Sequence, residues 1–205
     1  MNLVLATRNE HKVREVGRIL APYGIAVEPL PEAVALPAED GETFADNALP
    51  KARAAAHALG RRTIADDSGI EAEALGGAPG VRSARYAGEH ASDEANLAKL
   101  LAEAPAGSGL RYVCALAYVD PEVPASEGGE RVFMGESRGR LAARPRGDRG
   151  FGYDPAFVPD GEPAFVRDGE PAELTMAELE DSDKDAISHR GRALRAFAEW
   201  YAAAR

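Results

Sequence analysis

The chain has 205 residues, of which 45% are hydrophobic and 28% are charged, so it is long enough to bury a core and has the balance of a globular protein. Its 24 Lys and Arg residues against 34 Asp and Glu residues give a net charge of −10, which disfavours a broad nucleic-acid-binding surface. No apolar stretch approaches the roughly 20 residues that a membrane-spanning helix needs. An anionic ligand must therefore meet a local cluster of cations, metal ions or backbone N–H groups.

The single cysteine, Cys114, excludes an intrachain disulfide framework and a multi-cysteine metal site. Because it lies in an apolar run, we expect it to pack in the core. The first residues lack a basic segment and lead directly into strand-like sequence, so we do not expect a signal peptide. These features favour a cytoplasmic protein.

The first third of the sequence predicts alternating strands and helices. Residues 3–6 form a short apolar run typical of a buried strand, and residues 10–20 predict a helix that Asn9 caps and that ends near Pro22 and Gly24. The patterns that follow predict a strand over 25–28, an acidic loop over 30–42, a helix over 43–59 with a kink or break at Pro50, and a strand over 62–66 that ends in Asp66-Asp67-Ser68-Gly69.

The rest of the chain predicts a turn-rich segment, a helix, two strands and a final helix. These elements are expected over residues 76–90, after Ser92, over 111–119 and 131–137, and over 183–204. A local duplication repeats residues 160–164 at 168–172, and we expect it at the surface. No linker separates these elements, so we expect a single domain over 1–205 of the α/β class with a mixed sheet.

The turn at Thr7-Arg8-Asn9-Glu10-His11-Lys12 leaves a strand and opens a helix. Free N–H groups and the positive end of the helix dipole favour an anion there. Arg8 and Lys12 add positive charge, and a lysine in the first turn opposes the dipole unless a phosphate binds. On this segment alone, a solvated lysine is equally compatible with the sequence.

Two acidic segments suggest a metal site. Residues 39–42 are Glu-Asp-Gly-Glu, and Asp66 and Asp67 close a predicted strand. Adjacent strand residues point to opposite faces, so both aspartates can face one site only if the strand ends between them. Carboxylates beside a phosphate site suit Mg²⁺, and one of them could take a proton from an attacking water. Taken singly, an acidic loop and a turn explain these residues better.

Two further segments carry candidate ligand groups. Gly150-Phe151-Gly152-Tyr153-Asp154-Pro155 places aromatic faces between glycines, although an aromatic strand entering a core is the better interpretation in isolation. Ser182 and Asp185 form a capping signal for the last helix. On its apolar stripe lies Arg190, which requires a carboxylate or a bound anion as its partner.

These segments occur together in a fixed order along the chain. The stretches concerned are Leu5–Asn9 with Lys12, Thr43–Phe44 with Asn47–Ala48 and Lys51–Ala52, Ala65–Gly69, Leu75–Val81 with Ser83–Gly88, Gly150–Pro155, Thr175–Leu179, Lys184 and Ser188–Arg190. In this combination the chain resembles the inosine triphosphate pyrophosphatase family, the non-canonical purine nucleoside triphosphate pyrophosphatases also called HAM1-like or RdgB-like enzymes.

The resemblance implies a mixed central sheet flanked by helices, with two lobes, a deep cleft and a homodimer. It also implies Mg²⁺-dependent hydrolysis of ITP, dITP and XTP to the monophosphate and pyrophosphate. By motif match, the triphosphate would be held by Thr7, Arg8, Asn9, Glu10, His11 and Lys12, assisted by Lys51. Asp67 would act as general base and metal ligand, with Ser68 on the substrate. The nucleotide, largely its base, would be surrounded by Phe151, Gly152, Tyr153, Asp154, Lys184, His189 and Arg190.

The sequence departs from the family at one metal position. The family's other metal carboxylate lies three residues before the glycine matched by Gly41, where this chain has Ala38, and the carboxylate is Glu39 instead. Either Glu39 reaches the metal, or ligation relies more on Asp67 and water. Ala38 also keeps open a non-catalytic nucleotide-binding or sensor protein, against which the intact Asp66-Asp67 pair argues. A general nucleoside triphosphatase is the third hypothesis.

Overall fold

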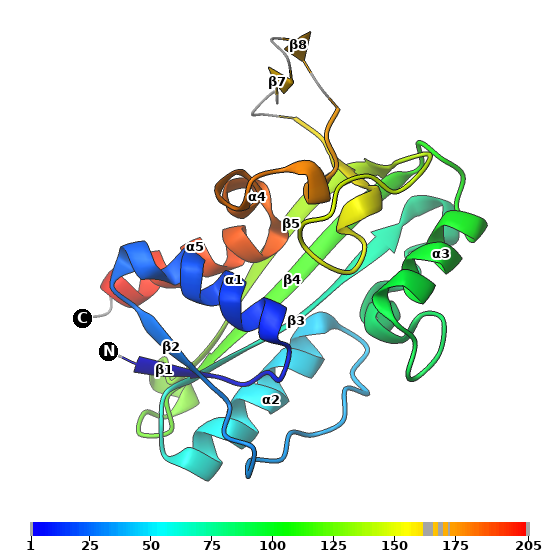
Figure 1. Ribbon diagram of the computed structural model, residues 1–205. Coiled ribbons are helices and arrows are strands. Elements are labelled where there is room, and N and C mark those ends of the chain that lie inside the picture. The colour runs from blue at the N-terminus through cyan, green and yellow to red at the C-terminus, as the bar shows by residue number, and fades with distance from the viewer. Residues whose placement is uncertain (1, 162–165, 168–169, 172, 204–205) are drawn as a thin grey trace. The chain divides into compact units, whose positions relative to one another are not determined.

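The computed structural model describes residues 2–161, 166–167, 170–171 and 173–203. The chain divides into two compact units (Figure 1). Unit 1 comprises Met1–Ser68, Val113–Glu136 and Ser188–Arg205, and unit 2 comprises Gly69–Tyr112 and Ser137–Ile187. Two units agree with the two lobes that the resemblance implies, whereas the cleft between them stays a prediction.

Six strands form one mixed sheet in the order β2-β1-β3-β4-β5-β6. β1 pairs in parallel with both β2 and β3, whereas β5 pairs antiparallel with β6, which confirms the predicted mixed α/β class. The strands are β1 (Asn2–Leu5), β2 (Ala26–Pro29), β3 (Thr63–Ala72), β4 (Gly109–Val119), β5 (Glu130–Leu141) and β6 (Phe157–Pro159). Val166–Arg167 (β7) and Glu170–Pro171 (β8) form a separate antiparallel pair.

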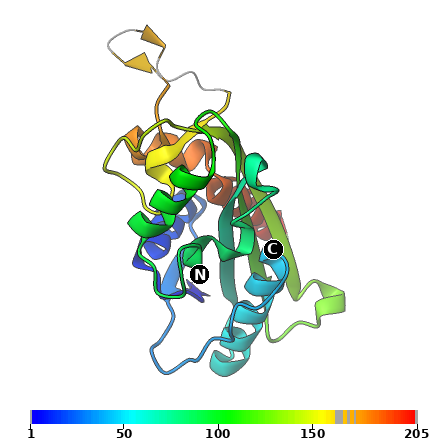
Figure 2. The ribbon, with the colours of Figure 1, turned by 90° about the vertical axis from the view of Figure 1, so that its right-hand side faces the viewer.

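In unit 1, helices cover both faces of the strands (Figures 1 and 2). α1 (Glu10–Leu20) and α5 (His189–Ala203) share one hydrophobic cluster with β1, β3, β4 and β5. α2 (Phe44–Leu59) buries an alanine-rich face and approaches the strands from the other side. The core of this unit contains Leu3, Leu5, Leu20, Ile64, Cys114, Leu116, Leu194 and Phe197.

Unit 2 has its own core, formed between the far ends of β3, β4 and β5 and two further helices. These are α3 (Asp93–Glu103) and α4 (Asp181–Ile187). The cluster includes Ile70, Leu100, Tyr112, Leu141, Phe157 and Met176. Each unit therefore has its own hydrophobic core, which supports the predicted site residues that the unit contains.

Local capping fixes where several helices begin. Asn9 accepts hydrogen bonds from the backbone N–H groups of His11 and Lys12, Thr43 forms a capping box with Asp46, and Ser92 caps α3. All three starts confirm the sequence prediction to within a residue. α2 runs through Pro50, so the break considered there does not occur.

Three predicted boundaries are wrong. The strand expected over 131–137 runs on to Leu141 as β5. β3 does not end after Asp66 but continues to Ala72, because Ile70 and Ala72 carry the strand into the core of unit 2. The final helix is split: α4 begins at Asp181, and α5 begins after Ser188, whose hydroxyl accepts a hydrogen bond from Gly191 N at 3.0 Å. Ser188 thus serves as the cap of a new helix, in place of the capping signal expected at Ser182.

None of the described helices is long and apolar enough to span a membrane. Cys114 is a buried free thiol, as expected. The duplicated loop falls mostly outside the described residues, so its expected surface position is not tested.

Candidate active site

The predicted site residues fall into two clusters, one in each unit. Unit 1 holds those from the N-terminal turn, the acidic loop, β3 and the start of α5, which are Thr7, Arg8, Asn9, Glu10, His11, Lys12, Glu39, Lys51, Asp67, Ser68, His189 and Arg190. Unit 2 holds Phe151, Gly152, Tyr153, Asp154 and Lys184. That both clusters serve one ligand stays a prediction.

The β1–α1 turn is organised by Asn9. Its side-chain oxygen accepts from the backbone N–H groups of His11 at 2.9 Å and Lys12 at 3.2 Å. Thr7 Oγ1 accepts from Asn9 N at 3.2 Å. Because these helix-start N–H groups already have a partner, positive charge at this turn depends mainly on side chains. Glu10 and His11 are exposed, and His11 Nδ1 lies 2.8 Å from Arg14 Nη2.

Lys12 turns inward to the strand beside it. Its Nζ lies 3.0 Å from Asp66 Oδ2, which is fully buried. Asp66 is an even-numbered β3 residue, as is Ile64 of the α1–α5 core, so both face that helix layer. The ammonium group is therefore fixed at the end of β1 by a carboxylate from β3.

Arg190 joins the same carboxylate from α5. Its Nε and Nη2 donate to Asp66 Oδ2 at 3.2 and 3.1 Å, its Nη1 donates to Glu15 Oε2 at 2.5 Å, and its Nη2 donates to Ser68 Oγ at 2.9 Å. The sequence leaves open whether Arg190 pairs with a carboxylate or with a bound anion. The structure shows that it pairs with the carboxylates of Asp66 and Glu15. His189, the first residue of α5, is also buried.

Glu15 is a contributor that the sequence analysis missed. It is 7% exposed and lies on the buried face of α1 with Val16 and Ile19. A carboxylate on a buried stripe needs a partner, which is the same signal that singled out Arg190. Burial alone would raise the pKa of Asp66, but Lys12, Arg190 and Lys51 together hold it well below its usual range.

Asp67 points to the opposite face of β3, toward α2. Asn47 Nδ2 donates to Asp67 Oδ2 at 2.9 Å, and Asn47 Oδ1 accepts from Gly41 N at 2.7 Å. A Cβ on Gly41 would lie 2.6 Å from Asp46 Cβ, so only glycine lets the acidic loop approach α2 this closely. Asn47 therefore links the loop to the predicted base.

Lys51 ties the acidic loop to β3. Its Nζ donates to the backbone oxygen of Asp66 at 2.9 Å and forms an ion pair with Glu39. Burial raises the pKa of Asp67 above its ordinary value, and the charge of Glu39 raises it further, while Lys51 and Asn47 act against this. A carboxylate with a raised pKa accepts a proton from water more readily, because its pKa lies closer to neutral pH.

A cavity of about 410 Å³ lies where the turn and the loop meet. It is lined by Ala6, Thr7, Arg8, Ala35, Leu36, Glu39 and Lys51. Arg8 Nη2 donates to Val34 O at 2.9 Å and Glu32 O at 3.3 Å, so its guanidinium also holds the loop in place. The structure thus places Thr7, Arg8, Glu39 and Lys51 around one cavity.

The unit 1 carboxylates fit a hard divalent cation. Mg²⁺ takes oxygen ligands and is commonly bound by one or two carboxylates together with waters and substrate phosphates. Glu39 and Asp67 are such a pair, and their mutual repulsion would be relieved by a cation between them. In the described part of the chain, no three His, Cys, Asp or Glu side chains are placed to hold a metal ion. Ligation by two carboxylates is consistent with that result.

The unit 2 cluster centres on Asp154. Lys184 Nζ donates to Asp154 Oδ2 at 2.7 Å, Phe151 N donates to the same oxygen at 2.9 Å, and Tyr112 OH donates to Oδ1 at 3.2 Å. Lys184 Nζ lies 5.3 Å from the centre of the Phe151 ring. Gly150 has a φ of 71°, and a Cβ there would lie 2.2 Å from Asp154 Oδ2, so glycine is required.

Two further bonds fix the aromatic loop. Gly152 N donates to Asp93 Oδ2 at 2.8 Å, and Tyr153 OH donates to Ser83 O at 2.7 Å. Tyr153 is buried, and its hydroxyl links the aromatic loop to Ser83 within unit 2. The sequence analysis did not single out Asp93 or Tyr112 as a site residue, although Tyr112 lies on the buried face of β4 with Leu110.

Comparison with known proteins identifies the family. The model of the Ham1 family matches residues 3–200. A relative from Frankia alni, described as a dITP/XTP pyrophosphatase, is 49% identical over 212 residues and covers 97% of this chain and 96% of its own length. A Mycobacterium tuberculosis relative of the same description is 45% identical, with 94% and 91% covered.

Solved structures of similar proteins point to the same family. A HAM1 protein from Coxiella burnetii superimposes with a TM-score of 0.80 at 36% identity, covering 98% of both chains. A nucleoside-triphosphatase, dITP/XTP pyrophosphatase, from Mycobacterium abscessus gives a TM-score of 0.68 at 42% identity, covering 96% of this chain and 98% of its own. The chain belongs to the Ham1 family.

Proposed function

We propose that this protein hydrolyses the purine nucleoside triphosphates dITP, ITP and XTP to the nucleoside monophosphate and pyrophosphate. The observation that carries the proposal is the unit 1 cluster, in which Lys12 pairs with Asp66 and Lys51 pairs with Glu39, and the charges of both lysines act on Asp67. The relatives are described as dITP/XTP pyrophosphatases, which are catalysts, and this gives the non-catalytic alternative no support.

Charge balance supports a divalent metal at this cluster. Lys12 and Lys51 already face Asp66 and Glu39, so they cannot by themselves neutralise a triphosphate. We propose that Glu39 and Asp67 hold Mg²⁺, which would supply positive charge to the phosphate oxygens. Glu39 then takes the place of the family's ligand at the position of Ala38.

Asp67 is the proposed general base. It takes a proton from the water that adds to the phosphate chain as the bond between the α-phosphate and the β-phosphate breaks, and pyrophosphate leaves. Asn47 donates to one Asp67 oxygen and Ser68 N to the other, at 2.9 and 3.0 Å, which fixes the carboxylate's orientation. Thr7, Lys12 and Lys51 bind the phosphates.

Recognition of the base is assigned to the unit 2 cluster with the start of α5. Hypoxanthine and xanthine present an acceptor at O6, where adenine presents a donor. Lys184 and His189 are the proposed donors to O6, so a 6-amino base would leave buried donors unsatisfied. The guanidinium of Arg190, also expected near the base, is bonded to Glu15, Asp66 and Ser68 instead. The Phe151 ring offers a flat face for the purine.

Incubation of the pure protein with ITP and Mg²⁺ tests the proposal. We expect pyrophosphate and IMP as products. Release of orthophosphate alone would refute the bond assignment, and tight ITP binding without turnover in either Mg²⁺ or Mn²⁺ would restore the sensor hypothesis. We further propose a homodimer, on the family resemblance, and a cytoplasmic location, which a buried free thiol supports.

A further inference from the structure

Asn47 bonds to both segments that carry the proposed metal-binding carboxylates. It lies in the first turn of α2 and is only 2% exposed. Its Oδ1 accepts from Gly41 N at 2.7 Å, two residues after Glu39, and its Nδ2 donates to Asp67 Oδ2 at 2.9 Å. One buried side chain on a helix therefore contacts the acidic loop and β3 at the same time.

The direction of these two bonds is fixed by the backbone of the loop. A backbone N–H group can only donate, so Gly41 N requires the oxygen of the amide, and the NH₂ group must then face Asp67. The start of α2 is itself fixed, because Thr43 and Asp46 form a capping box and Thr43 O accepts from Asn47 N at 3.3 Å. Asn47 thus presents a donor to Asp67 for as long as the loop stays bound.

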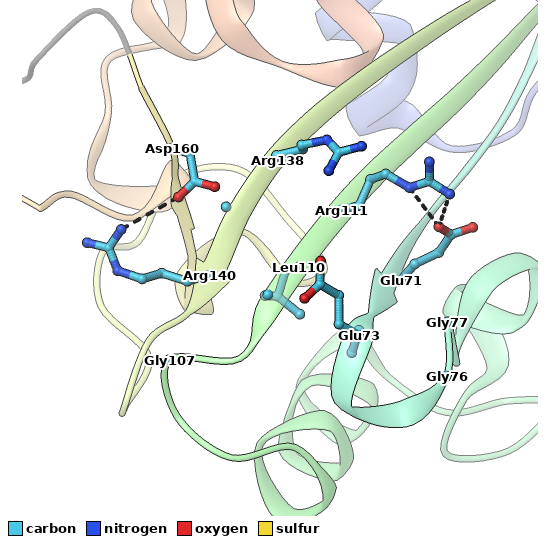
Figure 3. Close-up of a pocket in the computed structure, with 13 residues that line it drawn as sticks. Glu71, Glu73, Gly76, Gly77, Gly107, Leu110, Arg111, Arg138, Arg140 and Asp160 are labelled. Carbon is cyan, nitrogen blue, oxygen red and sulfur yellow. Dashed lines mark hydrogen bonds and ion pairs between the residues drawn. The ribbon is translucent and has the colours of Figure 1, made fainter.

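Carboxylates are held differently in a hollow of about 710 Å³ in unit 2 (Figure 3). There Arg111 donates to Glu71 through Nε at 2.8 Å, and Arg140 lies 3.6 Å from Asp160. A guanidinium group orients a carboxylate and also balances its charge. A divalent cation would have to compete with the arginine for such an acid.

Asp67 is oriented by neutral groups instead. Within the described ranges, its side chain accepts hydrogen bonds from Asn47 Nδ2 at 2.9 Å and from Ser68 N at 3.0 Å, and neither donor is charged. Lys51 acts on Asp67 through its charge, but its Nζ forms its ion pair with Glu39. An amide donor therefore fixes the Asp67 carboxylate and leaves its negative charge for a cation.

We propose that Asn47 is a positioning residue for the metal site, which holds Asp67 in its binding orientation and keeps the segment of Glu39 docked on α2. The inference rests on the proposed function, since it concerns the metal that Glu39 and Asp67 hold there. Gly41 is needed for the same contact, because a Cβ on it would lie 2.7 Å from Asn47 Oδ1. Loss of a residue that orients a metal ligand commonly lowers metal affinity or activity by roughly 10- to 100-fold.

Binding of Mn²⁺ to the protein without nucleotide tests the inference. Free Mn²⁺ is measured by electron paramagnetic resonance, and urea unfolding is recorded for each variant. Asn47→Leu approximately keeps the side-chain volume but removes both bonds, and it should raise the Mn²⁺ dissociation constant about tenfold. Gly41→Ala forces the loop away from α2 while the donor to Asp67 remains, and it should raise the constant severalfold.

Asn96→Leu is the control for a purely structural role. Asn96 is also 2% exposed, and within unit 2 it accepts from Ala87 N at 2.8 Å and donates to Ala84 O at 3.1 Å. Its replacement should lower the urea midpoint as Asn47→Leu does, because each variant leaves two buried partners without a bond. Binding of Mn²⁺ and hydrolysis of ITP should stay at the wild-type level in Asn96→Leu.

The inference is overturned if folded Asn47→Leu binds Mn²⁺ as the wild type does, or if Asn96→Leu weakens binding equally. Should Asn47→Leu fail to fold, wild-type affinity in Gly41→Ala overturns it. Wild-type protein that hydrolyses ITP but binds no Mn²⁺ without nucleotide refutes the inference alone. Binding of Mn²⁺ that depends on Asn47, in a protein that does not hydrolyse ITP, refutes the proposed activity alone.

Discussion

The two units bury their charges in different ways. Unit 1 holds a network in which several acids and cations share partners across α1, α2, β3 and α5, whereas unit 2 buries the ion pair of Asp154 with Lys184 beside an aromatic ring. The unit 1 network consists of the acids Glu15, Glu39, Asp66 and Asp67 with the cations Lys12, Lys51 and Arg190. A surplus of acid among fixed cations suits a metal and a polyphosphate, while a single donor beside a ring suits a polar, flat base.

The largest expected effect concerns the base in unit 1. Asp67→Asn should lower kcat for ITP by roughly a thousandfold, because a general base contributes about 10²–10⁴ to the rate. The amide can still accept from Asn47, so circular dichroism should show an unchanged fold. Asp40→Asn, an exposed acid of the same loop, is the matched control and should retain activity. Full turnover by Asp67→Asn would remove this residue from its role.

The shared network should also make unit 1 sensitive to the loss of a buried cation. Arg190→Met leaves Asp66 and Glu15 buried with fewer partners, which should cost about 3–5 kcal/mol of unfolding free energy. Arg53→Met removes an exposed pair with Glu130, where Arg53 is 47% exposed, and should cost about 1 kcal/mol or less. Urea unfolding measures both, and equal costs would contradict the description of Arg190 as the centre of a buried network.

The two units should differ in their effect on the preference for ITP over ATP. Lys184→Gln should lower the ratio of kcat/KM for ITP to that for ATP by roughly tenfold, because it removes the ammonium group that we propose as a donor to O6. Lys12→Gln should lower kcat/KM for both nucleotides by a similar factor and leave their ratio unchanged. A changed ratio in Lys12→Gln, or an unchanged one in Lys184→Gln, would refute the division between phosphate and base.

The smallest expected effect is at Cys114. Burial raises the pKa of this thiol to about 12, and the charge of Asp66 adds to the rise. The thiolate is the reactive form, so at pH 8 only about one thiol in ten thousand is ionised. A disulfide reagent should therefore modify the unfolded protein rapidly and the native protein hardly at all. Rapid labelling of the native protein would show that this core opens.

Local signals predicted much of this fold. Asn9, Thr43 and Ser92 each offer a side-chain oxygen to a helix start, and the elements they cap begin where expected. Tertiary contacts decided the remaining boundaries. Asp66 and Asp67 resemble a turn in sequence, yet each finds partners on its own face of β3, so the strand continues.

The candidate site was predictable as a set of residue types but not as a set of contacts. The sequence identified Arg8 as a cation, although its guanidinium binds the carbonyl groups of the acidic loop. Arg190 was expected near the base, and it bonds Glu15, Asp66 and Ser68. Such pairings join residues far apart in the chain, as in Arg190 with Glu15, and no periodicity within one helix specifies them.

One comparison of substrates tests the central claim most directly. The values of kcat/KM for ITP, XTP, ATP and GTP are measured with the wild-type protein and Mg²⁺, with pyrophosphate as the detected product. The account predicts that ITP and XTP exceed ATP by a large factor, up to roughly 10⁴ where buried donors are left unsatisfied. Equal values for ITP and ATP would contradict it.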